Sequence, residues 1–407
     1  MTINQQPINK TSAYTRAAAY YTMLWGSIAL AGSFIAVDLN RRGINELQWS
    51  IISAVRSLTI FLVTPLVTRF ADRKNARVKV LQAVLVLNGL SLLLYMVFDG
   101  FWGFLAASVI VNLMGAGMMP LGDSIIVRMA RRHDIQYGRL RLWGSIGYMI
   151  FGLLGGFLWD RLGGYEYLYW AGCLATLLIA VVAARLQEPL PEGAAGDELN
   201  IEPADKKSIF TILRADLVLA GFLLVTLLRA SGELLFFTFS GVYMDQLTNQ
   251  AFFIGLINGG AAAVEIPTML FMQHWIKKFG IEIIMVVGLF IQAMGLALFA
   301  FTFNPWWMFV GASLRNVGFA LFFIAGVQFI DLRAEADVAS TYQGMMSSIS
   351  WGLAPLVISP LGGWIYQSMG GQTVFIVATL FSGIGALVMI PIMIRSKNET
   401  RLAARSE

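Results

Sequence analysis

Long apolar runs separated by short polar stretches dominate this chain of 407 residues. Twelve runs of roughly 18–28 mostly apolar residues are each long enough to cross a hydrocarbon core of about 30 Å. Because backbone polar groups in lipid must be satisfied within their own segment, each run is predicted to be a helix. The predicted spans are residues 14–38, 46–70, 78–98, 101–129, 138–159, 165–186, 212–243, 250–274, 281–301, 306–331, 339–366 and 372–395.

One long polar stretch interrupts this pattern, "QEPLPEGAAGDELNIEPADKKSI" from residue 187 onward. Its proline, glycine and acidic residues are typical of a flexible linker. It divides the spans into six and six. The predicted organisation is a cytoplasmic tail (1–13), a six-helix bundle (14–186), a cytoplasmic linker (187–211), a second six-helix bundle (212–395) and a cytoplasmic tail (396–407).

A glycine pattern repeats between the two halves. Gly155 and Gly156 are followed by Gly163 and Gly164 near the end of the fifth span, and four glycines recur 207 residues later near the end of the eleventh. With the central linker, this spacing indicates a two-fold duplication. Two parallel six-helix halves with a central site are a known transporter architecture. The predicted fold class is therefore an all-α membrane protein of twelve helices in two pseudo-symmetric bundles.

Composition and charge support this topology. The chain is 57% hydrophobic and only 13% charged, whereas soluble domains are about 25% charged. Of the 29 lysines and arginines, 23 fall in the tails and loops that share a side with both termini. The positive-inside rule places that side in the cytoplasm, with the protein in the cytoplasmic (inner) membrane. Topology thus accounts for the net charge of +5, and we expect no nucleic-acid partner.

Two further features limit the possibilities. The first 13 residues, "MTINQQPINKTSA", are polar, and no short apolar core with a cleavage site follows, so we expect the first helix to be retained. The single cysteine, Cys173, excludes an internal disulfide and a cysteine metal cluster.

Seven of the charged residues within the predicted spans are candidate site residues. A charge in the bilayer costs at least about 2.5–3.5 kcal/mol on insertion scales, so such residues usually face a cavity or a partner. Arg229 and Glu233 are one turn apart, which favours an ion pair between them. Asp38 and Asp331, at helix ends, are expected to be solvated. The seven are Arg56, Asp123, Arg141, Arg229, Glu233, Glu265 and Arg315.

The hairpin between the fourth and fifth spans places two of these charges at equal depth, where they can face each other as a charge pair. Asp123 and Arg141 are both nine residues from Arg132, near the tip of the loop. Tyr148 is seven residues beyond Arg141 on the same helical face, and Gly144 between them would leave a gap. A guanidinium, a carboxylate and an aromatic ring can bind a polar ring by hydrogen bonds and stacking. The alternative is a structural ion pair that locks the hairpin.

The loop between the second and third spans resembles a signature of the major facilitator superfamily. In "TRFADRKNAR", Asp72, Arg73 and Arg77 match the pattern G-x-x-x-D-R-x-G-R-R. Thr68, Asn75 and Ala76 depart from it, although asparagine tolerates the left-handed conformation that a glycine would supply. The resemblance implies a conformational latch at the cytoplasmic face; the alternative is an ordinary positive-inside loop.

The segment "DSIIVRMARRHDIQYGRLRLWGSIGY" (123–148) resembles the oligosaccharide/proton symporters, the family of the lactose permease, and is similar to the phenylpropionate-permease branch. The resemblance implies that Asp123 and Arg141 correspond to the family's carboxylate–arginine pair for sugar hydroxyls. Tyr148 falls where the family has a stacking tryptophan. The predicted substrate-binding set is Asp123, Arg141, Tyr148, Gly144, Arg315 and Arg56, and the two last arginines hint at an anionic solute.

The second half resembles this family less closely. Glu265 in "AVEIP" stands on the helix that carries the family's coupling glutamate, and a carboxylate in a dry cavity can hold a proton at neutral pH. The alternative is a Glu265 paired with Arg315 or Arg229. Arg315, Gly318 and Trp351 replace the histidine, carboxylate and lysine of the family's proton route. If protons are coupled, Glu265, Glu233 or Asp123 must therefore carry them.

Together these features predict a secondary active transporter and not an enzyme. A small polar organic solute (a sugar, nucleoside or organic acid) would cross by alternating access, with proton symport, no cofactor and a monomeric protein in the bilayer. No nucleotide-binding loop is present. "FGLLGG" (151–156) has glycine where many exporters of the superfamily have proline, which favours import. A proton-driven exporter of drugs or metabolites, and a transporter-like receptor without net flux, remain alternatives.

Overall fold

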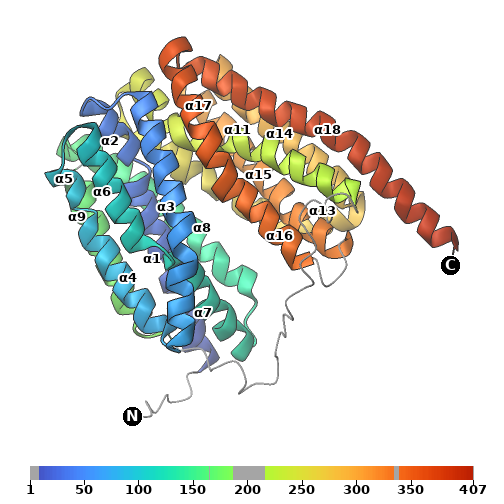
Figure 1. The fold of residues 1–407 in the computed structure, drawn as a ribbon, viewed down its shortest axis with the longest axis horizontal. Helices are drawn as coiled ribbons and strands as arrows, with labels where there is room; N and C mark the ends of the chain where they lie inside the picture. Colours follow the sequence, from blue (N-terminus) through green and yellow to red (C-terminus); the bar gives the residue numbers. More distant parts are fainter. Residues whose placement is uncertain (1–8, 165, 187–215, 334–338, 407) are drawn as a thin grey trace. The chain divides into compact units, whose positions relative to one another are not determined.

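The structure is a computed structural model that describes residues 9–164, 166–186, 216–333 and 339–406. In the first half of the chain (Figure 1), the elements are α1 (Lys10–Ser27), η1 (Ile28–Gly32), α2 (Ile35–Arg41), α3 (Glu46–Arg73), α4 (Arg77–Ser91), α5 (Leu94–Val97), α6 (Gly100–Gly115), α7 (Met118–Arg132), α8 (Tyr137–Leu162) and α9 (Glu166–Ala183). Elements labelled η are π-helical turns.

The second half continues the all-helical pattern. Its elements are α11 (Leu217–Thr248), α12 (Ala251–Gly255), η2 (Leu256–Gly260), α13 (Ala261–Phe279), α14 (Ile281–Phe301), α15 (Pro305–Arg333), α16 (Ala339–Ser348), η3 (Ile349–Leu353), α17 (Ala354–Met369) and α18 (Gly371–Ser406).

Within the described residues, 12 helical segments are long and apolar enough to cross a membrane, which confirms the predicted number. Several are compound. The first span joins α1, η1 and α2 over Lys10–Arg41, and the eighth joins α12, η2 and α13 over Ala251–Phe279. The predicted linker, 187–211, lies outside the described residues.

The chain separates into two compact units. Unit 1 comprises Met1–Glu198 and Met244–Ala263, and unit 2 comprises Leu199–Tyr243 and Val264–Glu407. The end of α11, with α12 and η2, therefore belongs to the unit of the first-half helices. Close glycine packing explains this grouping, because a Cβ on Gly152 of α8 would lie 3.1 Å from the Cα of Gly259 in η2.

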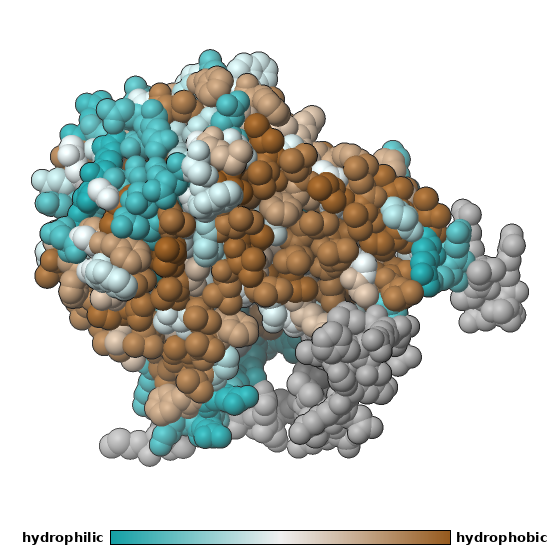
Figure 2. Space-filling model, turned by 45° about the horizontal axis from the view of Figure 1, so that its top comes forward, coloured by the Kyte–Doolittle hydropathy of each residue, from teal (hydrophilic) through white to brown (hydrophobic). Residues whose placement is uncertain are grey.

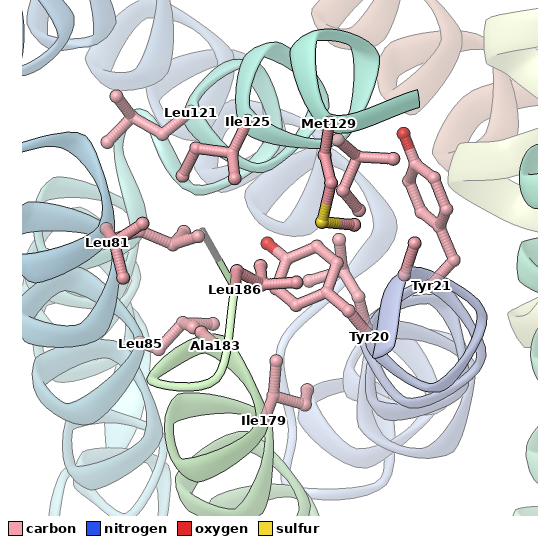
Figure 3. Packing of buried hydrophobic residues seen from close by; sticks show 14 of the residues in the cluster. Tyr20, Tyr21, Leu81, Leu85, Leu121, Ile125, Met129, Ile179, Ala183 and Leu186 are labelled. Atoms are coloured by element: carbon pink, nitrogen blue, oxygen red, sulfur yellow. The ribbon is translucent and has the colours of Figure 1, made fainter. Parts of the chain in front are cut away.

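Each unit has its own buried core. In unit 1, leucines and isoleucines of α4, α7 and α9 surround Tyr20 of α1, which Figure 3 shows turned into the cluster while Tyr21 extends beside it. Gly122 of α7 makes room for the Tyr20 hydroxyl, which a Cβ there would overlap. In unit 2, Phe222, Phe322 and Phe329 pack together as part of the corresponding core.

Apolar side chains also cover the outside of the helices. Figure 2 shows hydrophobic residues over most of the visible flank, and Leu66, Leu174 and Leu270 are each about 60% exposed. A soluble protein rarely exposes apolar patches of this extent. These surfaces fit the lipid contact that the hydrophobic runs predicted.

The glycine repeat has a positive φ at one corresponding position in each half. Gly163 follows α8 with φ +77°, and Gly370 follows α17 with φ +85°. Only glycine adopts a positive φ at little steric cost. The ψ angles differ, 13° at Gly163 and 161° at Gly370, so only Gly163 ends its helix in the left-handed helical conformation.

Candidate functional site

A polar cluster of unit 1 lies where α1, α7 and α8 meet, and we call Tyr21, Trp25, Asp123, Arg141 and Tyr148 the Asp123 cluster. Asp123 on α7 is half-buried. Tyr21 of α1 donates a hydrogen bond from its hydroxyl to Oδ1 of Asp123 at 2.6 Å. The Tyr137 hydroxyl lies 3.2 Å from that of Tyr21. The carboxylate is therefore held by a neutral phenol.

Arg141 has an aromatic partner instead of a carboxylate. Its Cζ lies 4.2 Å from the centre of the Trp25 ring, a cation–π contact. The Trp25 and Tyr148 ring centres are 6.4 Å apart, so the indole lies beside both predicted site residues. The Nε1 atom of Trp25 is buried and has no hydrogen-bond partner among the described residues.

Gly144 allows this arrangement. A Cβ at this position would lie 2.6 Å from Cδ1 of Trp25 and 2.7 Å from Nη1 of Arg141. The predicted gap beside Gly144 is therefore occupied by the Trp25 ring and the guanidinium. The sequence predicted a gap here because the pattern of the hairpin gives no information on the side chains that α1 contributes.

The two charges of the cluster do not neutralise each other directly. Among the described residues, Asp123 and Arg141 form no ion pair with one another; each has an aromatic neighbour. The Arg141 charge still acts on Asp123 through space. The hairpin thus brings both charges to one region, as their equal distance from the loop predicted. The expected direct charge pair between them is absent among the described residues, because Tyr21 and Trp25 of α1 contact the two side chains.

Tyr21 and Trp25 were missed by sequence reasoning. They are four residues apart on α1 and so share one face. A signal was present in "YYTMLW" (20–25), where aromatic side chains with hydrogen-bonding groups lie well inside a predicted span. Aromatic residues of membrane proteins gather at the two interfaces, and that expectation obscures a pair placed deeper in a span.

Arg56 lies elsewhere in unit 1, on α3. It is half-buried, with its Cζ 5.7 Å from the Trp49 ring centre, and its Nε has no hydrogen-bond partner among the described residues. The structure therefore places Arg56 against its own helix, and no described contact joins it to the Asp123 cluster.

Unit 2 holds a second polar cluster, formed by Glu233, Gln292, Arg315 and Asn316, which we call the Glu233 cluster. Arg315 of α15 forms an ion pair with Oε1 of Glu233 on α11. Gln292 of α14 donates to the other carboxylate oxygen at 3.1 Å, and Arg315 also donates to Asn316. The Arg315 guanidinium lies 4.1 Å from the Phe236 ring centre.

This arrangement contradicts the expected pair between Arg229 and Glu233. Arg229 lies one turn away on α11, but its Cζ lies 5.3 Å from the ring centre of Phe319 and 5.5 Å from that of Phe322, both on α15. Glu233 pairs with Arg315 instead, 82 positions further along the chain. Helical spacing makes two residues neighbours, but the packing of α11 on α15 decides which of them meet.

Gly318 has a structural explanation, and Trp351 is exposed. A Cβ on Gly318 would collide with the carbonyl oxygen of Gly288, and Gly311 and Gly295 make the same close approach about two turns earlier on α15. The α14–α15 interface therefore has no room for a carboxylate at position 318. Trp351 lies in η3 and is 61% exposed.

Glu265 lies near the middle of the eighth span, as the sequence predicted. It is half-buried on α13, five residues after the π-helical turn η2 and two before Pro267. π-Helical turns inside α-helices are frequent at functional sites. The loop between α3 and α4 has the left-handed residue that the sequence predicted, since Asn75 adopts φ +45°. In the same loop, Nε of Arg77 donates a hydrogen bond to Asp72 at 2.5 Å.

One expectation about solvated charges is wrong. Asp38 on α2 is fully buried, because the Tyr169 hydroxyl of α9 donates to its Oδ2 at 2.5 Å and Nη1 of Arg42 lies 3.6 Å from the same atom. Asp331 is exposed as expected and accepts a hydrogen bond from Gln343.

Comparison with known proteins identifies the family. A family model described as the MFS_1 like family matches residues 14–377. The chain belongs to this family. The maltose permease of Geobacillus stearothermophilus is a relative, 26% identical over 327 residues that cover 80% of each chain. The sucrose permease of Escherichia coli is 22% identical and covers 68% of this chain and 65% of its own.

Solved structures of the same fold agree with the helical architecture. The crystal structure of the nucleoside transporter NupG superposes with a TM-score of 0.76 at 14% sequence identity, covering 95% of this chain and 99% of the other. At this identity the likeness shows the fold alone. The family, the fold and the membrane-spanning helices together show that the chain is a multi-pass membrane transporter of the major facilitator superfamily and not an enzyme.

Proposed function

We propose that the protein is a secondary active transporter that carries a small polar organic solute, a sugar, nucleoside or organic acid, by alternating access with proton symport. The observation that carries this proposal is the Asp123 cluster, where a carboxylate and a guanidinium lie in the same region without an ion pair between them among the described residues. The names of the relatives, permeases of maltose and sucrose, support a polar solute of this size.

The Asp123 cluster supplies the chemistry that a hydroxylated ring requires. Arg141 offers parallel N–H donors, Asp123 offers acceptor oxygens, and Trp25 and Tyr148 offer aromatic faces for stacking. Gly144 permits their close approach. Arg315 and Arg56 remain predicted members of the site, but the Arg315 guanidinium is already bound to Glu233 and Asn316.

Glu265 is our proposed proton carrier. Both oxygens of Glu233 already have partners, Arg315 and Gln292, and Asp123 is assigned to the substrate. Glu265 is half-buried in a span, where a carboxyl group can exchange a proton as its surroundings change. We propose that Asp72, Arg73 and Arg77 act as a latch on the cytoplasmic face, in a monomer with both termini in the cytoplasm.

Uptake into proteoliposomes tests the transport cycle. Radiolabelled substrate is first chosen by a thermal-shift screen of sugars, nucleosides and organic acids. Acidifying the side from which substrate enters should then stimulate uptake, since a symporter moves protons in the same direction. Inhibition by this gradient would indicate a proton-driven exporter. Tight binding with neither flux nor exchange would indicate a receptor.

The proton site has its own test. Glu265→Gln removes the exchangeable proton while keeping the side-chain size, so substrate uptake should lose its stimulation by the proton gradient. Substrate exchange without a gradient provides the control for folding. An unchanged pH dependence in this variant would place the proton site elsewhere.

A further inference from the structure

Arg229 is a buried charge that no polar group binds in the described part of the chain. It is on α11 and only 2% exposed. Its Nε and Nη1 atoms are buried and have no hydrogen-bond partner among the described residues. Its neighbours are the rings of Phe319 and Phe322.

Arg229 and the charged groups that act on it include two guanidinium groups and one carboxylate among the described residues. Arg229 lies within electrostatic range of Glu233 and Arg315, but Glu233 is bound to Arg315 and Gln292. The Glu233 carboxylate therefore neutralises Arg315, and Arg229 has no ion-pair partner among the described residues. A lone charge is expensive inside a membrane protein, and such residues usually mark a ligand or ion pathway.

Other polar atoms nearby are also unpaired. Oε1 of Gln292 and Nε of Arg315 are buried without hydrogen-bond partners in the described part of the chain. Oγ of Ser382 on α18 is also buried without a hydrogen-bond partner among the described residues. Gly232 is one turn from Arg229, and a Cβ on it would lie only 2.6 Å from this Oγ. Unpaired donors and acceptors thus occur on side chains of the same unit as Arg229, for which the described residues supply no hydrogen-bonded anion.

We propose that Arg229 binds the carboxylate of an organic anion, which would make such an anion the transported solute. The guanidinium would donate two parallel N–H bonds to the two carboxylate oxygens, the geometry in which arginine binds carboxylates most strongly. Phe319 and Phe322 would exclude water around the ion pair and contact the apolar part of the solute. This inference rests on the proposed transport function and narrows its substrate class.

Matched pairs of charged and neutral probes test the inference on the purified full-length protein. The pairs are 3-phenylpropionate with 3-phenylpropionamide, and glucuronate with glucose. In wild type the carboxylate of at least one pair should bind about 10- to 100-fold more tightly than its neutral partner, as expected for a charge-assisted hydrogen-bond pair. In Arg229→Gln this ratio should fall to about one, and Arg229→Lys should keep part of it.

Two controls make the result specific. Arg139→Gln removes one exposed positive charge from unit 1 and should leave the ratio as in wild type. Ligand-free melting reports folding, and Arg229→Gln should melt no lower than wild type. The variant loses the two ring contacts of Arg229, but it loses no described hydrogen bond or ion pair and it removes a buried charge. A lower melting temperature together with a retained carboxylate preference would mean that Arg229 is structural.

The remaining outcomes are also decisive. Equal binding of charged and neutral probes, or no binding of any carboxylate, would overturn the inference. Stabilisation by sodium phosphate equal to that by the carboxylate probes would also overturn it and would indicate a site for small inorganic anions. Uptake of glucose without a carboxylate preference would leave the transport function intact. Absence of flux for every ligand that binds would instead overturn the transport function.

Discussion

The two polar clusters treat their charges in opposite ways. In the Asp123 cluster of unit 1, the carboxylate and the guanidinium each contact an aromatic side chain, Tyr21 and Trp25, and form no ion pair with each other among the described residues. In the Glu233 cluster of unit 2, the carboxylate and a guanidinium meet directly. Charges that are kept apart can both reach a ligand, whereas charges that are joined mainly maintain the packing around them.

The difference follows from the residues at each helix crossing. In unit 1, Gly144 and Gly122 admit the large rings of Trp25 and Tyr20 between helices. In unit 2, Gly288, Gly295, Gly311 and Gly318 bring α14 and α15 so close that their backbones touch. Tight packing of this kind leaves Arg315 little space other than toward Glu233, and Arg229 then has no carboxylate among the described residues.

The largest expected effect is on stability, in unit 2. Arg315→Met leaves the Glu233 carboxylate buried without its ion-pair partner, and breaking a buried pair costs about 3–5 kcal/mol. Thermal or denaturant unfolding in detergent measures this loss. The double variant Glu233→Gln with Arg315→Met should recover much of it. An unchanged stability of the single variant would remove the contrast between the clusters.

The next effect is on transport, in unit 1. Arg141→Ala removes the donors that we assign to the substrate, and uptake into proteoliposomes should fall at least about 100-fold, which corresponds to about 2.7 kcal/mol. Arg139→Ala is the matched control, because this exposed arginine points about 200° away around the same helix. Equal loss in the two variants would argue against a specific site.

Asp123→Asn should have a smaller effect. Asparagine keeps the shape and still accepts a hydrogen bond from Tyr21, but it lacks the charge that strengthens bonds to substrate hydroxyls. Substrate affinity measured by calorimetry should fall about 10-fold, or about 1.4 kcal/mol. Asp331→Asn, at an exposed helix end, serves as the control. Full affinity in Asp123→Asn would restrict the site to Arg141 and the aromatic residues.

The smallest expected effect tests the hydrogen bond that orients Asp123. Tyr21→Phe deletes the hydroxyl that donates at 2.6 Å, and a single bond to a charged group contributes about 1.5–3 kcal/mol at most, less when solvent replaces it. Substrate affinity should fall only a few-fold, with no change in maximal uptake. A loss as large as that of Arg141→Ala would mean that Tyr21 contacts the substrate.

Hydrophobic length and glycine spacing were sufficient to predict the fold. Helices in lipid must satisfy their own backbone, so apolar runs translate directly into spans. The cost of burying charge likewise singled out Asp123, Arg141, Glu233 and Glu265 for further consideration. These predictions depend on properties of one segment at a time.

Predictions about partners were less successful, for a physical reason. The contact between Glu233 and Arg315 joins positions 82 apart, and the contact between Trp25 and Arg141 joins α1 to α8. Such pairs depend on which helix faces meet, and a local pattern does not contain that information. The i,i+4 rule therefore favoured Arg229 as the partner of Glu233, and a position near a helix end favoured solvent for Asp38, although Tyr169 covers it.

The most direct test of the central claim is one set of melting curves for Arg141→Gln, recorded with and without a substrate that stabilises the wild-type protein. If Arg141 belongs to a substrate site and not to a structural pair, the ligand-free variant should remain within about 1 kcal/mol of wild type and the substrate should no longer raise its melting temperature. A destabilised variant that still responds fully to substrate would contradict this account and make the Asp123 cluster structural.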